Sequence, residues 1–157
     1  MNLSTHLTLE ECTVSDTAKR LGISNQPTEK HLESMKLLAN NIFEPIRMHF
    51  GKPIFVSSGY RSEALNKAIP GSSSTSQHCK GEALDLDQDG KGTGVSNVDV
   101  FNFIKANLNF DQLIWEYGDD KNPDWVHVSY SPSGSQRKQI LRATRNAQGG
   151  VVYTAIK

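Results

Sequence analysis

The chain has 157 residues, which is enough for one domain with its own hydrophobic core. Lysine and arginine together number 17, and so do aspartate and glutamate, so the formal net charge is zero. This balance gives no electrostatic basis for binding nucleic acid or an anionic membrane surface. We therefore expect a single domain over residues 1–157 that acts as a monomer and binds neither partner.

Several other protein classes are excluded by missing patterns. The two cysteines, Cys12 and Cys79, are too far apart in sequence for a CxxC zinc motif and provide no disulfide framework. No apolar run approaches the length of a membrane-spanning helix. The first residues, MNLSTHLTLEE, have neither the basic region nor the apolar region of a secretory signal. We expect a chain that is made in the cytoplasm without a signal peptide and does not insert into a membrane.

The N-terminal third of the sequence predicts helices. Thr8 and Glu11 have the spacing of a capping box, so a short helix begins there, and a second one covers residues 15–22. Over residues 28–50 the apolar residues recur at helical spacing, and Pro45 should kink or interrupt the long helix that they predict. These apolar residues are Leu32, Met35, Leu38, Ile42, Phe43 and Ile46.

The rest of the chain alternates between strands and helices. Strands are expected over residues 53–58, 82–87, 110–117, 125–130, 140–144 and 151–155. Short helices are expected over residues 63–68 and 96–108, the second capped by Ser96 and Asp99. Residues 70–77 have the composition of a loop. Successive strands joined by short turns favour antiparallel pairing, so the fold class is α+β, a small antiparallel sheet with helices packed on one face.

Two of these strands carry metal-ligating side chains opposite their aliphatic residues. Because side chains alternate along a strand, the leucines of residues 84–86 share one face and Asp85 takes the other. In residues 126–128 the valines likewise leave His127 on the opposite face. His78 enters from the loop before the first of the two strands. Two histidines and one carboxylate suit a catalytic zinc ion, with the fourth position left to water.

A calcium site is the competing interpretation of the same segment. Asp85, Asp87, Asp89 and Gly90 have the spacing that opens an EF-hand loop. Such a loop needs a bidentate acid at its twelfth position, which is Ser96 here, and it needs a helix before it rather than a strand. We therefore expect Asp87 and Asp89 to be solvated turn acids, and a second cation beside them is left open.

Three segments resemble one known family. SQHCKGEALD, residues 76–85, fits the S-x-H-x-x-G-x-A-x-D pattern of zinc D-alanyl-D-alanine carboxypeptidases and of their relatives, phage L-alanoyl-D-glutamate endopeptidases and D-alanyl-D-alanine dipeptidases. SGYRS, residues 58–62, resembles a second segment of that family, and WVH, residues 125–127, resembles its second histidine motif. The resemblance implies that His78, Asp85 and His127 are zinc ligands in a cleft lined by the sheet.

The resemblance leaves two candidates for the general base. Asp124 lies three residues before His127, which matches the catalytic acid of several family members. Glu116 matches an acid of the closest branch. Alternation puts Asp124 opposite His127 unless the strand begins at Trp125, and it does not fix the face of Glu116. We rank Asp124 first by its spacing.

Three more residues are expected to contact the substrate. The arginine that matches Arg61 binds substrate or the oxyanion in the family, and a planar guanidinium suits that task because it can hold a carboxylate with two hydrogen bonds. Ser76 and Gln77 come just before the first ligand and are expected to bind the substrate backbone.

The implied function is that of a zinc metallopeptidase that hydrolyses peptidoglycan stem peptides, at D-Ala-D-Ala, L-Ala-D-Glu or a related bond. Because the substrate lies outside the cytoplasmic membrane and no export signal is visible, we expect a phage product that acts in lysis or within a particle. A bacterial enzyme exported by another route is the other origin that fits. The alternatives are a non-catalytic zinc-binding module, as in the related hedgehog signalling domain, and a structural zinc site with His6, His31 or His49 as a fourth ligand.

Overall fold

A six-stranded sheet forms the centre of the computed structural model, which describes residues 1–70, 72–73 and 75–156. The strands lie in the order β1-β2-β4-β3-β5-β6, and all neighbours are antiparallel except β3 and β5. Their bounds are β1 Val56–Ser58, β2 Ala83–Leu86, β3 Gln112–Glu116, β4 Trp125–Ser129, β5 Gln139–Arg145 and β6 Val151–Ala155. The α+β class is confirmed.

The parallel pair β3–β5 departs from the fully antiparallel sheet that the sequence predicted. β4 turns back beside β3, and residues 130–138 then carry the chain to the other side of β3, so that β5 runs in the direction of β3. Short connections between strands favour antiparallel neighbours, and that rule does not detect a crossover.

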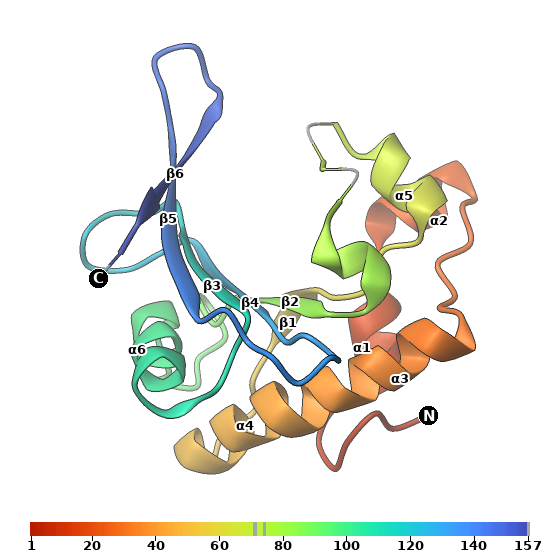
Figure 1. Cartoon of the computed structure of the whole chain (residues 1–157), viewed down its shortest axis with the longest axis horizontal. Coiled ribbons are helices and arrows are strands. Elements are labelled where there is room, and N and C mark those ends of the chain that lie inside the picture. The colour runs from red at the N-terminus through yellow and green to blue at the C-terminus, as the bar shows by residue number, and fades with distance from the viewer. Residues whose placement is uncertain (71, 74, 157) are drawn as a thin grey trace.

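One face of the sheet is covered by helices (Figure 1). α3 (Glu29–Leu38), the π-helical segment η1 (Ala39–Phe43) and α4 (Glu44–Phe50) form one continuous rod beneath the sheet, and α6 (Asn97–Asn107) lies beside it. The short helices near the β1 edge are α1 Leu9–Thr13, α2 Asp16–Leu21 and α5 Glu63–Ala68. None of the helices in the described residues is both long enough and apolar enough to cross a membrane.

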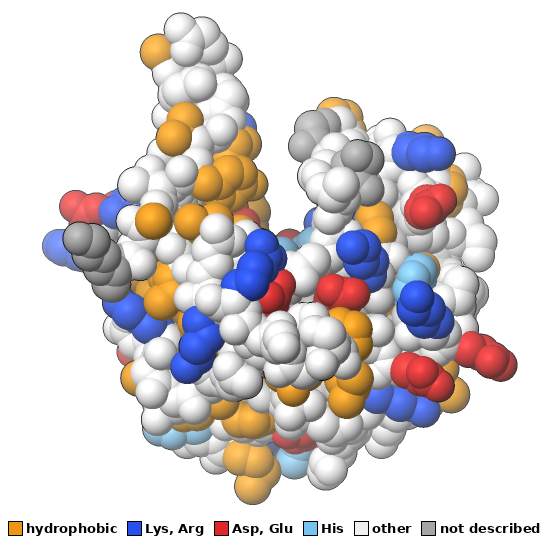
Figure 2. All heavy atoms as spheres, viewed as in Figure 1, with side chains coloured by type: hydrophobic (Ala, Val, Ile, Leu, Met, Phe, Trp, Pro, Cys, Tyr) orange, Lys and Arg blue, Asp and Glu red, His pale blue; other side chains and the backbone are white. Residues whose placement is uncertain are grey.

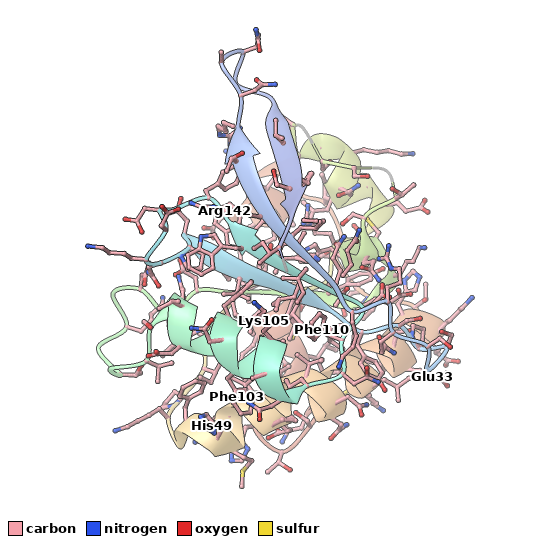
Figure 3. All side chains as sticks on the ribbon, turned by 60° about the vertical axis from the view of Figure 1, so that its left-hand side comes forward. Glu33, His49, Phe103, Lys105, Phe110 and Arg142 are labelled. Atoms are coloured by element: carbon pink, nitrogen blue, oxygen red, sulfur yellow. The ribbon has the colours of Figure 1, made fainter. Side chains whose placement is uncertain are left out.

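The core lies between this helical layer and the covered face of the sheet. Its most deeply buried side chains from the strands are Leu84, Leu86, Leu113, Val126 and Val128. The helices contribute Leu38, Ile42, Ile46, Val100 and Ile104. α4 and α6 also meet through His49, whose ring stacks on Phe103 at a centroid distance of 4.1 Å (Figure 3). The other face of the sheet is left free for a site.

The predicted helix starts are confirmed. Thr8 and Glu11 form a complete capping box at α1, and Ser96 and Asp99 form one at α6. In each box the hydroxyl accepts from a backbone N–H inside the helix and the acid accepts from the backbone N–H of the cap residue.

The long helix is interrupted, which is one of the two effects expected of Pro45. Glu44 donates its backbone N–H to the carbonyl of Ala39, five residues back, so Ala39–Phe43 is a wider π turn. Pro45 follows at once and has no N–H to donate. The wider turn relieves the clash that the proline ring would make with the preceding helical turn, and α4 then continues in the same direction.

Asn97 is a fully buried polar residue that joins two loops. Its amide oxygen accepts from the backbone N–H of Gln88 at 2.7 Å, and its nitrogen donates to Asp87 Oδ1 at 3.0 Å. The same nitrogen reaches the carbonyls of Pro123 at 3.2 Å and Asp124 at 3.0 Å. One side chain therefore fixes the segment after β2 against the segment before β4.

Replacing Asn97 with alanine should leave these buried groups without partners. We expect the free energy of unfolding to fall by about 1–3 kcal/mol, the usual penalty for an unsatisfied buried group. Asn102→Ala, at an exposed position of the same helix, is the matched control and should change little. Urea unfolding of both variants measures the difference, and equal midpoints would contradict the role of Asn97.

Candidate metal centre and cleft

Asp85 and His127 are brought together by strand pairing. β2 and β4 are antiparallel neighbours, and their register sets Asp85 directly opposite His127. Both side chains point to the uncovered face because their neighbours along the strands point into the core. The alternation read from the sequence therefore placed these two residues correctly.

His78 lies in a short 3₁₀ turn, η2 (Gln77–Lys80), and not in an extended segment. The turn ends at Gly81, which has a left-handed φ of 73°. A side chain at Gly81 would put its Cβ 2.5 Å from the carbonyl oxygen of His31, so the turn packs directly on α3. This contact sets the position of His78 at the end of β2.

The ring of His78 is oriented by a backbone carbonyl. Its Nδ1 lies 2.6 Å from the carbonyl oxygen of Gly59, and the residue is only 3% exposed. Because a carbonyl only accepts hydrogen bonds, Nδ1 carries the hydrogen and Nε2 is the ring nitrogen that faces Asp85. Histidine ligands of metal sites commonly have such an outer partner.

The three residues form a compact group of potential ligands. Asp85 Oδ1 lies 3.2 Å from His78 Nε2 and 3.0 Å from His127 Nδ1. The three ligand atoms all lie within 4.8 Å of one another, and no other His, Cys, Asp or Glu group in the described part of the chain has this arrangement. Burial by itself would raise the pKa of Asp85, but the charges and hydrogen bonds of the two histidines hold that pKa far below its usual value.

The donor set fits a zinc ion that keeps one open position. Two imidazoles and one carboxylate are ligands that catalytic zinc sites use. The three spare histidines have other partners: His6 lies 2.9 Å from Glu44, His31 lies 3.0 Å from the Tyr60 hydroxyl, and His49 stacks on Phe103. Cys79 follows His78 but is not part of the group. The arrangement thus matches a catalytic site better than a closed structural one.

The three residues line a cleft of about 710 Å³. In Figure 1 the β5–β6 hairpin rises on one side of it, and α5 with the segment that follows rises on the other. Figure 2 shows the same two projections with a hollow between them. The cleft is also lined by the segment before His78, including Ser72, Ser73, Thr75, Ser76 and Gln77.

Glu116 lies in this cleft beside the histidines. The register pairs Ile114 with His127 and Glu116 with Trp125, so all four side chains share the uncovered face. Glu116 is only 8% exposed. Burial is the main reason that the pKa of Glu116 is raised to about 7. The charge of His127 lowers this pKa, and the charge of Asp85 raises it.

Asp124 lies outside the cleft. Its backbone N–H donates to the carbonyl of Glu116 at 2.8 Å, and its own carbonyl accepts from Asn97. Its side chain is exposed and does not line the cleft. β4 begins at Trp125, yet Asp124 still points away, because it keeps the alternation of Val126. The geometry therefore favours Glu116 over Asp124 as the base, and the choice between them stays a prediction.

Arg61 has unused hydrogen-bonding capacity at the edge of the cleft. Its backbone N–H donates to the carbonyl of His78 at 3.1 Å, and one guanidinium nitrogen reaches Asn66 Oδ1 at 3.4 Å. Its Nε is buried and makes no hydrogen bond within the described structure. A guanidinium in this state can still receive a carboxylate or an oxyanion.

Ser76 and Gln77 both line the cleft, but both also hold the turn of His78 in place. The Ser76 hydroxyl accepts from the backbone N–H of His78 at 3.2 Å. Gln77 donates to Glu82 at 3.2 Å and to Asp111 at 3.0 Å. Contact with substrate stays a prediction for both residues.

Asp111 is a structural residue that the sequence analysis missed. Arg137 donates two side-chain hydrogen bonds to it, at 3.1 and 2.8 Å, besides the bond from Gln77. These hydrogen bonds, that from Arg137 first, outweigh burial and lower the pKa of Asp111. The residue thereby ties the His78 turn, the start of β3 and the segment before β5 together. Only the order of the strands, which the sequence did not provide, could have indicated this.

The acids of the alternative calcium loop are used within the fold. Asp87 Oδ1 accepts from Asn97 at 3.0 Å and from the backbone N–H of Asp89 at 3.1 Å. Asp89 accepts from Asn122 at 3.3 Å. The segment before them is strand β2 and not a helix. These contacts favour a braced turn over an EF-hand.

A family model matches most of the chain. Residues 5–129 match the model of a family described as Peptidase M15. The matched range contains all three candidate ligands, Glu116 and Arg61, and it ends before β5. No curated protein matches the chain.

We predict that the chain binds one zinc ion through His78, Asp85 and His127. Elemental analysis after reloading should find one zinc per wild-type chain and close to none in His127→Ala. His49→Ala removes a histidine far from the group and should keep the metal. Zinc at a hundred times its Kd should also stabilise the wild type by about 2.7 kcal/mol. Reloaded wild type without zinc would refute this site.

Proposed function

The chain belongs to the peptidase M15 family, whose members are zinc peptidases of peptidoglycan, and on this premise we propose that it hydrolyses peptide bonds in peptidoglycan stem peptides, at D-Ala-D-Ala, L-Ala-D-Glu or a related bond. The observation that carries the proposal is the group of His78, Asp85 and His127 at an open cleft with Glu116 beside it. A non-catalytic zinc module has no need of a buried acid at that place.

His78, Asp85 and His127 would hold the zinc ion. When bound, zinc lowers the pKa of water and polarises a carbonyl group. Glu116 would take the proton from the attacking water and pass it to the leaving amine as the C–N bond breaks. The products are a carboxylate and an amine, and the carboxylate of Glu116 is restored. Its burial supports this role because a base with a pKa near neutrality both accepts and returns a proton readily.

Arg61 would bind the negative charge of the substrate. Its Nε is buried without a hydrogen bond, and the side chain lines the cleft beside His78. The charge is either the terminal carboxylate of the stem peptide or the oxyanion that forms during hydrolysis. In the second case the contact strengthens as charge develops, which accelerates the reaction.

We also propose a role in phage lysis or within a phage particle. The support is the resemblance of residues 76–85 to the phage endopeptidases. Purified protein should then reduce the turbidity of permeabilised cells whose peptidoglycan contains the cleaved bond.

The function is tested most directly with defined muropeptides. Zinc-loaded protein should convert a muropeptide into fragments whose masses identify one peptide bond. Loss of the terminal D-alanine indicates a carboxypeptidase, and release of the stem from D-Glu onward, with L-alanine left on the sugar, indicates an L-Ala-D-Glu endopeptidase. Intact muropeptides after incubation with protein of confirmed zinc content would reject the proposal.

Replacing Glu116 with glutamine should lower kcat by about 10²- to 10⁴-fold, the usual contribution of general acid–base catalysis. A base works only when it is deprotonated, so wild-type activity should fall as the pH drops through its pKa. Burial raises the pKa of Glu116 to about 7, and a bound zinc ion would lower it from there. The acidic limb of the activity profile should therefore lie between the ordinary pKa of 4.5 and a pH of 7. Glu116→Gln should lose the limb while its zinc content stays near one.

Asp124→Asn is the matched control for this prediction. It removes the same charge eight positions along the chain, outside the cleft. This variant should retain the acidic limb and most of its kcat. The reverse outcome, a limb that survives Glu116→Gln and disappears in Asp124→Asn, would return the role of base to Asp124.

Arg61→Lys should lose much of its turnover although the charge is kept. A point ammonium cannot form the two parallel hydrogen bonds of a guanidinium, so we expect kcat/KM to fall by about tenfold or more. Arg20→Lys, an exposed conservative change in α2, should have no effect. Unchanged kinetics on a muropeptide for Arg61→Lys would remove this residue from the mechanism.

A further inference from the structure

The β5–β6 hairpin is a wall of the cleft that lies beyond the family match. The match ends at residue 129, whereas β5 and β6 span Gln139–Arg145 and Val151–Ala155. The hairpin stands opposite α5 across the hollow in Figures 1 and 2. Its contribution to the lining of the cleft is apolar and aromatic, from Leu141, Val151 and Tyr153. The family match therefore says nothing about the role of this hairpin.

Strand register brings the hairpin into line with the catalytic groups. Glu116 pairs with Ala143 across β3 and β5, and Ala143 pairs with Tyr153 across β5 and β6. Residues paired across a sheet point to the same face, so Glu116, Ala143 and Tyr153 form one row on the cleft side. Neighbouring strands lie about 4.8 Å apart, so the backbones of Glu116 and Tyr153 are separated by about 10 Å.

The residue between them leaves the row open. Ala143 has only a methyl side chain, and it is fully buried. The longer side chains of Glu116 and Tyr153 can therefore approach each other over it. Burial first, and then the charges of Glu116, Tyr117 and Asp85, raise the pKa of Tyr153.

Tyr153 is nevertheless available to a ligand. It is 55% exposed, and Val151 beside it on the same face is 43% exposed. Edge strands usually carry charged residues that prevent association, whereas β6 presents apolar side chains here. An exposed aromatic residue beside a reactive cleft suits contact with a bound molecule.

The opposite wall has the complementary chemistry. Ser72, Ser73, Thr75 and Ser76 supply hydroxyl groups there. An extended peptide with small apolar side chains could turn its backbone groups to the hydroxyls and its methyl groups to the hairpin. Alanine-containing stem peptides have this character.

We infer that the β5–β6 hairpin is a substrate-binding wall and that the ring of Tyr153 packs on the stem peptide beside the bond to be cut. The inference rests on the proposed function and extends it to a part of the chain outside the family match. Tyr153 contacts substrate in this scheme and has no role in holding the metal.

The test uses the zinc-loaded full chain with three substitutions in the hairpin. Tyr153→Ala should raise KM for a muropeptide about tenfold, as expected for truncation of an aromatic contact residue. Tyr153→Phe keeps the ring and should stay within about threefold of the wild type. Val152→Ala is the matched control, because Val152 is 41% exposed but is paired with Thr144 on the other face of the sheet. Thermal unfolding confirms that each variant is folded.

Binding gives a second measure that does not depend on turnover. In a Glu116→Gln background, Tyr153→Ala should raise the Kd for uncleaved muropeptide about tenfold. Val152→Ala in the same background should leave this Kd unchanged. Val151→Ser, on the cleft side of the same strand, should raise it as well.

The outcomes separate the two proposals. If the wild type cleaves muropeptides and both Tyr153→Ala and Val151→Ser bind and cleave them as the wild type does, the hairpin is not a substrate wall and the proposed function stands. If the wild type neither cleaves nor binds muropeptides, the proposed function fails and the inference fails with it.

Discussion

One carboxylate oxygen joins the two histidines, and the rest of the site depends on that contact. Asp85 lies in a strand whose other residues are buried, and an ionised carboxylate there must be compensated by positive charge or hydrogen bonds. Two distant segments meet this need. The register of β2 with β4 sets His127 opposite Asp85, and a turn that is fixed between Gly59 and α3 holds His78. A cation placed among the three would take over the same compensation, so the fold holds the ligands close together before any metal binds.

The sequence indicated the parts of the site that depend on local periodicity. Alternation along β2 and β4 identified the faces of Asp85 and His127, and capping patterns located the starts of α1 and α6. The face of Glu116 could not be read in this way, because it depends on how β3 pairs with β4. The crossover to β5 and the buried roles of Asn97 and Asp111 depend on partners far away in the sequence, so no local pattern announced them.

The cleft combines a floor and walls of different origin. The floor and the hydroxyl-rich side lie within the range that matches the family, whereas the apolar side is a hairpin that follows it. Under the two proposals, the reacting groups and the aromatic substrate contact of Tyr153 would lie in separate parts of one chain. This division is common where a rigid scaffold presents variable segments around a fixed reactive centre.

The π turn in the long helix has a consequence for insertions and deletions. Leu38, Ile42 and Ile46 are all buried, and they follow one another in steps of four residues. In a regular α-helix each such step turns the side chain about 40° further around the axis, since each residue turns it by about 100°. The extra residue within Ala39–Phe43 absorbs this drift and keeps the row facing the sheet. Deletion of one residue there would restore a regular helix with Ile46 seven positions after Leu38, which turns it by about 700°, close to two full turns, and keeps it facing the sheet. One added residue would instead rotate Ile46 by about 100° out of the core, so this segment tolerates a deletion better than an insertion.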